Sequence, residues 1–163
     1  MTTEEIIKNI TSRDTHKVWE SACEIINSGQ NHYTIAPLIK YLQLIKSSTA
    51  DLDMGGAFAP NQRFIDFAIA TIEFHENTKK CPCALFAKKF TLTNNLVKRE
   101  IKYEGFNPNK ELQKGNIKVL DTLYIDNNWI DYYLVECVKC KTQYKVEERE
   151  GHYMFWIWTY LKH

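Results

Sequence analysis

Hydrophobic positions in the first half of the chain recur with the 3.6-residue period of an α-helix. Over residues 14–28 the apolar side chains fall on one face, and Gly29 follows the last of them. A second apolar stripe covers residues 34–46, and residues 61–76 are apolar on nearly all sides. The pattern predicts three helices, the third of them buried. Their connection at 49–60 is too rich in Gly, Asp and Pro to be a continuous helix.

The period changes from 3.6 to 2 after Cys83, which indicates β-strands. The predicted strands, all rich in Tyr, Val, Ile, Phe or Trp, cover residues 85–90, 96–104, 118–126, 129–138, 143–150 and 153–161. Turn residues at 126–128 and 149–152 predict hairpins, and residues 105–115 predict the longest loop of this half. The last segment is apolar on both faces, so we expect a central strand or one that is covered on both sides.

The helical half is similar to a known repeat architecture. Residues 10–22, which read ITSRDTHKVWESA, resemble the entry to the second helix of a HEAT-type repeat, and residues 35–42 and 63–70 look like a second helical pair. The resemblance covers residues 1–76 and implies antiparallel helical hairpins. It departs from the repeat pattern in its long glycine-containing connection, and it supplies two pairs where roughly three or more repeats are normally needed. We therefore expect another element to cap the helices.

Four of the five cysteines fall in two tight pairs, Cys81–Pro82–Cys83 and Cys137–Val138–Lys139–Cys140. Thiolates are soft ligands that suit Zn²⁺, and four of them complete its tetrahedron. The second pair stands between two β-like runs and resembles the knuckle hairpin of a zinc ribbon, whereas the first has the spacing C-x-C where ribbons usually have C-x-x-C. Cys81, Cys83, Cys137 and Cys140 are therefore predicted to hold one structural Zn²⁺ ion, which would tie the end of the third helix to the sheet.

Other interpretations of these residues stay open. The four cysteines can be buried thiols, or Cys81 and Cys83 can form a redox pair. His75, six residues before Cys81, is a candidate substitute ligand or a hydrogen-bond partner of a ligand, although a histidine near a helix C-terminus also suits the helix dipole. Cys23 lies at helical spacing from core positions and is expected to belong to the core. The acidic, glycine-containing segment 51–56 is explained by a turn.

These patterns together predict an α+β fold, in which N-terminal antiparallel helical hairpins pack on a C-terminal antiparallel β-sheet with a structural zinc knuckle. Residues 1–80 form the helical half and residues 81–163 the sheet half, and we expect them to fold as one cooperative domain. Four Trp, nine Tyr and eight Phe among 163 residues exclude intrinsic disorder. No apolar run approaches the roughly 20 residues that span a bilayer, so no membrane association is expected.

The motifs and the net charge limit the classes of function that the chain can have. The chain contains none of the signatures G-x-S-x-G, H-E-x-x-H, G-x-x-x-x-G-K-[ST] or G-x-G-x-x-G, so a non-enzymatic role is expected. Its 21 basic and 20 acidic residues give a net charge of +1, without the basic excess of an obligate nucleic-acid binder. The acidic N-terminus, with no apolar leader after it, indicates a cytoplasmic protein.

A partner protein is therefore the expected ligand. Small cytoplasmic chains that combine HEAT-like helices or a zinc-ribbon-like sheet with no catalytic motif resemble bacterial immunity and antitoxin-type inhibitors. The alternative is a nucleic-acid-binding zinc ribbon, whose contact surface would be a basic ridge formed by Lys88, Lys89, Lys98, Arg99 and Lys102. Glu100 and Glu104 interrupt that ridge, which disfavours the alternative.

Overall fold

The computed structural model describes residues 1–56, 61–93, 99–126 and 129–162. It divides into two compact units: a helical unit formed by Met1–Leu85 with Lys89–Ile101, and a sheet unit formed by Phe86–Lys88 with Lys102–His163. Helices make up most of the first unit, and an antiparallel four-stranded sheet dominates the second. The chain is therefore an α+β protein, as its two hydrophobic periods predict.

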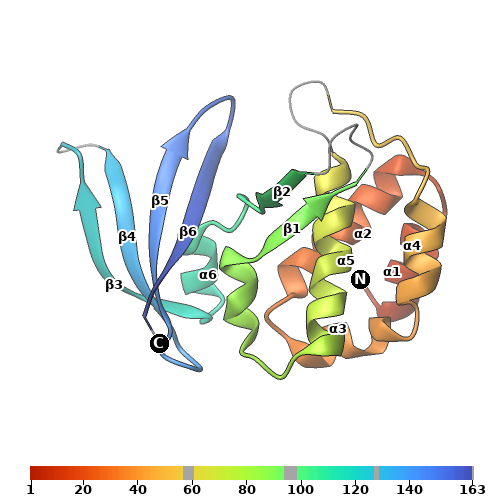
Figure 1. Ribbon diagram of the computed structural model, residues 1–163, viewed down its shortest axis with the longest axis horizontal. Helices are drawn as coiled ribbons and strands as arrows, with labels where there is room; N and C mark the ends of the chain where they lie inside the picture. The colour runs from red at the N-terminus through yellow and green to blue at the C-terminus, as the bar shows by residue number, and fades with distance from the viewer. Residues whose placement is uncertain (57–60, 94–98, 127–128, 163) are drawn as a thin grey trace. The chain divides into compact units, whose positions relative to one another are not determined.

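The described part of the helical unit contains five α-helices followed by two short strands (Figure 1). Their bounds are α1 (Thr3–Ile10), α2 (Thr15–Ser28), α3 (His32–Ile39), α4 (Leu42–Thr49), α5 (Gln62–Asn77), β1 (Lys89–Leu92) and β2 (Arg99–Lys102). Side-chain caps explain where the first three helices begin. Thr2 and Glu5 form a reciprocal capping box on α1, and the side chains of Asp14 and Asn31 accept hydrogen bonds from backbone N–H groups in the first turns of α2 and α3.

Helix α5 forms the centre of the helical unit, where it contacts α2, α3, α4 and β1 (Figure 1). Its residues Ile65, Phe67, Ala68 and Ile72 are fully buried, which agrees with the predicted all-round apolar pattern. The other fully buried apolar side chains of the preceding helices are mostly aliphatic: Ile10, Val18, Ala22, Ile25, Ile35, Leu38 and Ile45. The helical unit therefore has a continuous aliphatic core around one long helix.

A buried carboxylate ties α5 to the end of β1. Asp66 Oδ2 accepts a hydrogen bond from the backbone N–H of Thr93 at 2.7 Å, and Asp66 Oδ1 accepts from the Thr93 hydroxyl at 2.6 Å. Gln62 Nε2 also donates to Asp66 Oδ1 at 3.1 Å. Since a buried charged group is tolerated only when it is hydrogen-bonded, these contacts explain how Asp66 can lie in this core.

Several predictions for this half are wrong in detail. Helix α1 is not predicted by the pattern above, although Ile6 and Ile10 form a buried pair at helical spacing. The single helix predicted over 34–46 is two helices, α3 and α4, which are separated at Lys40 and Tyr41. Pro37 lies inside α3 and lacks the N–H that would continue the helical ladder. The Tyr41 N–H then bonds to Leu38 O in a tighter turn.

The first predicted strand is also shifted. Residues Pro82–Ala87 form a 3₁₀-helix, η1, and β1 begins only at Lys89. A period of 2 in so short an apolar run does not distinguish a strand from a tight helical turn. Residues 52–56 form a non-helical connection as predicted, and the remainder of that connection, 57–60, lies outside the described residues.

The described residues of the sheet unit form one short helix and four long strands. Their bounds are α6 (Pro108–Gln113), β3 (Ile117–Tyr124), β4 (Ile130–Cys137), β5 (Gln143–Glu150) and β6 (Met154–Lys162). The strands follow one another in the order β3–β4–β5–β6, and each neighbouring pair is antiparallel. Residues 151–153 connect β5 to β6, so the turn predicted at 149–152 is present but begins two residues later. The turn predicted at 126–128 lies partly outside the described residues.

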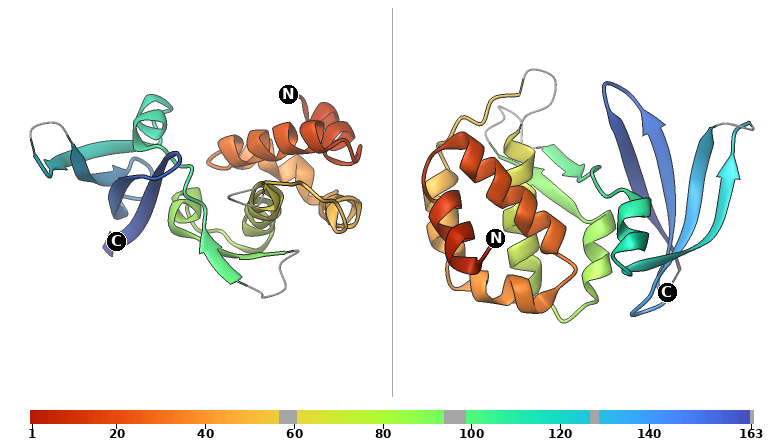
Figure 2. Two further views of the ribbon diagram at one scale, coloured as in Figure 1. Left: turned by 90° about the horizontal axis from the view of Figure 1, so that it is seen from above. Right: turned by 180° about the vertical axis from the view of Figure 1, so that it is seen from behind.

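Helix α6 lies where the sequence predicts the longest loop. Asn107 caps it by accepting a hydrogen bond from the Asn109 N–H, and Pro108 occupies its first turn. Glu111 is buried at its C-terminal half, where it accepts hydrogen bonds from Lys114 Nζ and Asn116 Nδ2. Figure 2 shows α6 beside β3, with which it is in contact. The helix has six residues, too few for a hydrophobic period to appear in the sequence.

Aromatic side chains dominate the core of the sheet unit. Val146 lies opposite Trp158 in the β5–β6 register, so both point to the same face of the sheet, and both are buried. Phe86 stacks on Trp158 with ring centroids 4.3 Å apart, and Phe106 meets Phe86 edge to face at 5.1 Å. The indole Nε1 of Trp158 donates a hydrogen bond to Phe106 O at 2.9 Å, so the polar atom of the buried ring is satisfied.

The last strand, β6, lies at the edge of the sheet, which corrects the expectation of a central or doubly covered strand. Of its described side chains only Trp158 is buried, and Tyr160 and Leu161 are exposed. The edge is partly shielded by the segment before α6. Trp156 N–H donates to Glu104 O at 3.0 Å, and Lys102 Nζ donates to Trp158 O at 2.8 Å. A strand that is apolar on both faces can therefore leave one face half exposed to solvent.

Candidate metal centre

The second cysteine pair lies on a tight turn between β4 and β5. Cys137 is the last residue of β4, and its N–H donates to Thr142 O at 2.9 Å. Lys141 N–H donates back to Cys137 O at 3.0 Å, and Lys141 has the left-handed φ of 64°. This conformation reverses the chain within a few residues, which brings Cys140 back toward Cys137. The predicted strand–C-x-x-C–strand arrangement is therefore present.

The Thr142 side chain supports the exposed member of this pair. Thr142 is buried, and its Oγ1 lies 3.1 Å from Cys140 Sγ. A hydroxyl at this distance can donate to a thiolate sulfur, an arrangement that orients a ligand and stabilises its negative charge.

The first cysteine pair stands at the entry to η1. Ala84 N–H donates to Cys81 O at 3.1 Å, so the chain bends immediately after Cys81. Pro82 is the first residue of η1, and its carbonyl accepts a hydrogen bond from Gln30 Nε2 at 3.0 Å. The fixed φ of proline and this hydrogen bond hold the bend that two ligands separated by one residue require.

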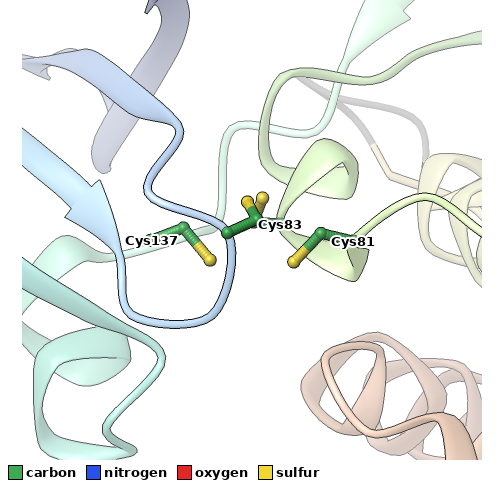
Figure 3. A group of neighbouring side chains, drawn as sticks. Cys81, Cys83 and Cys137 are labelled. Atoms are coloured by element: carbon green, nitrogen blue, oxygen red, sulfur yellow. The ribbon is translucent and has the colours of Figure 1, made fainter. Parts of the chain in front are cut away.

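The structure brings the four predicted ligands together. The Sγ atoms of Cys81, Cys83, Cys137 and Cys140 all lie within 4.8 Å of one another. Figure 3 labels three of these side chains, and the sulfur atoms of Cys81 and Cys137 are turned toward each other. In a tetrahedral site with bonds of about 2.3 Å, the sulfurs are about 3.8 Å apart, so this group fits a metal after a small contraction. The four cysteines can therefore hold a metal ion.

Burial and charge around the group suit a thiolate site. Cys83 and Cys137 are buried, Cys81 is half-buried and Cys140 is exposed. Exposed lysines stand next to both pairs in the sequence: Lys79, Lys80, Lys139 and Lys141. Four thiolates with a divalent cation carry a net charge of −2, which nearby lysines offset. All five cysteines of the chain are free of disulfide bonds.

His75 belongs to a different cluster. Its Nε2 lies 2.8 Å from Gly29 O, so it donates to that carbonyl, and its Nδ1 lies 3.1 Å from His32 Nδ1. Among the described residues, the group that can hold a metal consists of the four cysteines and does not include His75. This buried histidine therefore connects α5 to the start of α3 and is not brought to the thiols.

Cys23 is also separate from the metal group. Burial, followed by the negative charge of Glu20, raises the pKa of its thiol to about 11. The thiol is therefore protonated at neutral pH. The side chain is half-buried, so Cys23 lies at the margin of the helical core and not inside it as predicted.

The acidic segment before α5 is occupied by structural contacts. Asp51 receives two hydrogen bonds from Arg13, at 2.9 and 3.2 Å, and this interaction lowers the pKa of the Asp51 carboxyl. Asp53 Oδ1 accepts a hydrogen bond from the Gly55 N–H at 2.9 Å, and Gly55 has a positive φ of 65°. A turn explains these residues, as the sequence predicts.

The predicted basic ridge is only partly described. Lys98 lies outside the described residues, and the ammonium group of Lys102 is bonded to the Trp158 carbonyl. Lys89 and Arg99 are exposed on the short strands β1 and β2.

One surface feature was not predicted. Tyr124, Ile125 and Trp129, at the connection between β3 and β4, are all strongly exposed. The sequence did contain a signal for this exposure. A turn at the tip of a hairpin normally faces solvent, and large apolar residues stand on both sides of the Asp-Asn-Asn turn.

Comparison of the chain with protein-family models, with curated proteins and with solved structures gives no match. Within the described parts of the chain, none of the helices combines the length and the apolar character that crossing a bilayer requires.

Proposed function

We propose that this chain is a non-enzymatic protein-binding module whose fold is stabilised by one structural Zn²⁺ ion. In this proposal it acts in the bacterial cytoplasm as an immunity or inhibitor protein and binds a partner protein. Its helical pairs are then HEAT-like and its sheet is similar to a zinc ribbon.

The donor set supports zinc as the metal. Four cysteine thiolates form the soft, closed tetrahedral environment of structural zinc, with no position left for a water or a substrate. A site of this type stabilises the fold because its ligands are gathered only in the folded state. The knuckle turn at Cys137 and Cys140, which is already formed by backbone hydrogen bonds, would lose little further freedom on binding the ion.

The observation that carries protein binding is the distribution of exposed apolar side chains. In the sheet unit the described large hydrophobic residues that are exposed are Leu112, Leu120, Tyr124, Ile125, Trp129, Val138, Tyr153, Met154, Tyr160 and Leu161. In the helical unit they are Met1, Trp19, Tyr33 and Leu44. Aromatic residues are the typical anchors of protein interfaces, and soluble monomers seldom expose many of them. The sheet unit is therefore the proposed binding region.

Site-specific photo-crosslinking in the native cell tests this function. A photoreactive phenylalanine analogue in place of Tyr160, on the sheet, should yield a discrete cross-linked protein. The same analogue in place of Tyr33, which is 88% exposed on α3, is the matched control and should not. Cross-links to nucleic acid in place of protein, or identical products at both positions, would contradict the proposal.

Salt dependence separates the two classes of partner further. Contacts to phosphates make affinity fall steeply with salt, whereas an interface built on aromatic anchors depends on salt much less. Titration with labelled DNA and RNA at low and physiological salt should show no tight, salt-sensitive complex. Submicromolar binding that is lost on Lys89→Ala with Arg99→Ala would favour the nucleic-acid alternative.

A further inference from the structure

The outer half of the β3–β4 hairpin exposes more apolar surface than a structural hairpin requires. Tyr124, Ile125 and Trp129 are 59%, 69% and 57% exposed. Between Leu120 and Tyr132 none of the described residues is buried, whereas the other half of the hairpin contributes Ile117, Val135 and Cys137 to the buried set. Figure 1 shows β3 and β4 as neighbouring strands. The outer half therefore contributes little to the core of the sheet unit.

Hydrogen bonds restrain the main chain that carries these exposed side chains. Ile125 N–H donates to Trp129 O at 2.9 Å, and Trp129 N–H donates to Asp126 Oδ1 at 3.2 Å. Tyr124 lies opposite Ile130 in the β3–β4 register. An aromatic side chain on a restrained backbone loses less conformational entropy on binding than one on a mobile segment. These residues can therefore anchor a partner at a low entropic cost.

The charge of the hairpin indicates what it binds. Residues 117–137 hold one lysine and four acidic residues. Glu136 is paired with Lys118 and Asp131 with Arg149, so the negative charge of the outer half comes from Asp121 and Asp126. Asp121 and Asp126 are exposed and stand on either side of Tyr124 in the sequence. A surface of this charge repels nucleic acid and anionic bilayers and attracts a cationic partner.

We infer that the outer half of the β3–β4 hairpin is the docking surface for a protein that presents an apolar pocket surrounded by lysine or arginine side chains. The inference rests on the proposed protein-binding function and specifies its partner class. Tyr124, Ile125 and Trp129 enter the apolar pocket, and Asp121 and Asp126 face the basic rim. The aromatic anchors supply affinity, and the carboxylates supply the rate of association and the selectivity.

Selection from a display library of random linear peptides tests the inference with a defined probe. The library is selected on the zinc-loaded wild-type chain, and the enriched peptides are then measured against Tyr124→Ala with Trp129→Ala and against the control Tyr33→Ala. We expect peptides rich in Arg or Lys together with aromatic or aliphatic residues. Their Kd should rise about 30-fold or more for the hairpin double variant and stay unchanged for the control. Melting curves of both variants check that the fold is retained.

The charge is tested separately with Asp121→Asn and Asp126→Asn. The asparagine side chain at 126 can still accept the Trp129 hydrogen bond, so this variant changes charge alone. The association rate of the enriched peptides should fall severalfold, and the difference from wild type should disappear at high salt.

The remaining outcomes overturn the inference. Enriched peptides that are acidic or uncharged, peptides that bind the double variant equally well, or no enrichment at all contradict the hairpin as the docking surface. Binding of neutral phosphatidylcholine vesicles through Trp129 contradicts a protein as the occupant. If these results occur while the Tyr160 cross-link still captures a protein, the proposed function stands and only the location of its surface is wrong.

Discussion

The helical unit and the sheet unit bury different kinds of side chain. In the helical unit, aliphatic residues from several helices surround α5, which is buried along most of its length. In the sheet unit, the fully buried side chains concentrate around Phe86, Tyr144 and Trp158. The residues of β3 and β6 are largely half-buried or exposed. Truncating a buried aromatic ring removes more buried surface than truncating one aliphatic side chain, so the sheet unit depends more on each of its few rings.

A bound metal ion would add to the stability that these few aromatic rings give the sheet unit. Small cores often need a disulfide or a metal ion in addition to hydrophobic burial. The C-x-x-C turn connects β4 to β5, the two central strands of the sheet, so a bound ion would restrain the strands on which the aromatic core is built.

The largest expected effect is the loss of the central aromatic ring of the sheet unit. Trp158→Ala removes the stack on Phe86 and leaves the Phe106 carbonyl without its indole donor, so the free energy of unfolding should fall by about 3–5 kcal/mol. Urea denaturation measures the change. The control is Trp129→Ala, an exposed tryptophan of the same unit, which should cost no more than about 0.5 kcal/mol. Equal losses in both variants would show that burial does not distinguish these positions.

A second prediction concerns the thiol of the helical unit. Because the pKa of Cys23 is raised to about 11, its thiolate is scarce at pH 8, and iodoacetamide should alkylate it about 100-fold more slowly in the folded chain than in urea. The folded state favours the protonated thiol. Its contribution to stability is therefore present below the unfolded pKa and is lost as the pH rises toward the folded value.

Peptide-resolved mass spectrometry measures this alkylation rate. After a chelator is added, the four other cysteines should react faster than Cys23. A Cys23 rate in the folded chain equal to that in urea would refute the buried environment assigned to this residue.

The next prediction tests the buried polar contact of the helical unit. Asp66→Ala leaves the Thr93 N–H and hydroxyl without their acceptor and removes one of the two acceptors of the Gln62 amide, so it should destabilise the chain by about 2–3 kcal/mol. Thermal unfolding followed by circular dichroism measures the loss. Asp53→Ala, which removes an exposed turn hydrogen bond, is the matched control and should cost less than about 1 kcal/mol. A smaller loss for Asp66 than for Asp53 would contradict the role given to the buried carboxylate.

The smallest expected effect compares the two described non-glycine residues with a left-handed backbone, one in each unit. Lys141, with φ of 64°, ends the knuckle turn, and glycine adopts this conformation without strain. Lys141→Gly also removes an exposed hydrogen bond to Val138 O and a 4.0 Å ion pair with Glu136, so its net effect should be a stabilisation of about 0.5 kcal/mol. Arg13→Gly relieves the same kind of strain but removes the pair with Asp51, so its gain should be smaller. Chemical denaturation of both variants gives the comparison, and a loss of stability for Lys141→Gly would refute the argument.

Sequence patterns predicted the elements in which one face is regularly apolar and the other polar. Helix α2 and strand β5 begin and end within a residue of their predicted bounds, because a one-sided stripe or a strict alternation fixes an element along its whole length. The patterns failed where the decisive contact is a backbone or capping hydrogen bond, or the order of the strands. The break at Tyr41, the short helix α6 and the edge position of β6 depend on local hydrogen bonds or on strand order, which hydrophobicity does not encode.

The candidate metal group was predicted more completely than the fold around it. Cys81 and Cys137 are 56 positions apart in the sequence, yet the chemistry of paired thiols was sufficient to predict that they meet. The exposure of the hairpin at Trp129 was not predicted. An apolar residue in a predicted strand is assigned to the core by default, and the sequence does not show which end of a strand is covered by other residues.

The proposed zinc site is tested most directly by the metal content of the purified protein. Elemental analysis of chain purified without chelators should give about one zinc per chain. Cys137→Ser or Cys140→Ser should reduce that content strongly and lower the melting temperature, whereas Cys23→Ser, the matched control, should retain the metal. Wild-type protein with a metal content near zero, together with unchanged melting of the Cys137→Ser and Cys140→Ser variants, would contradict the account.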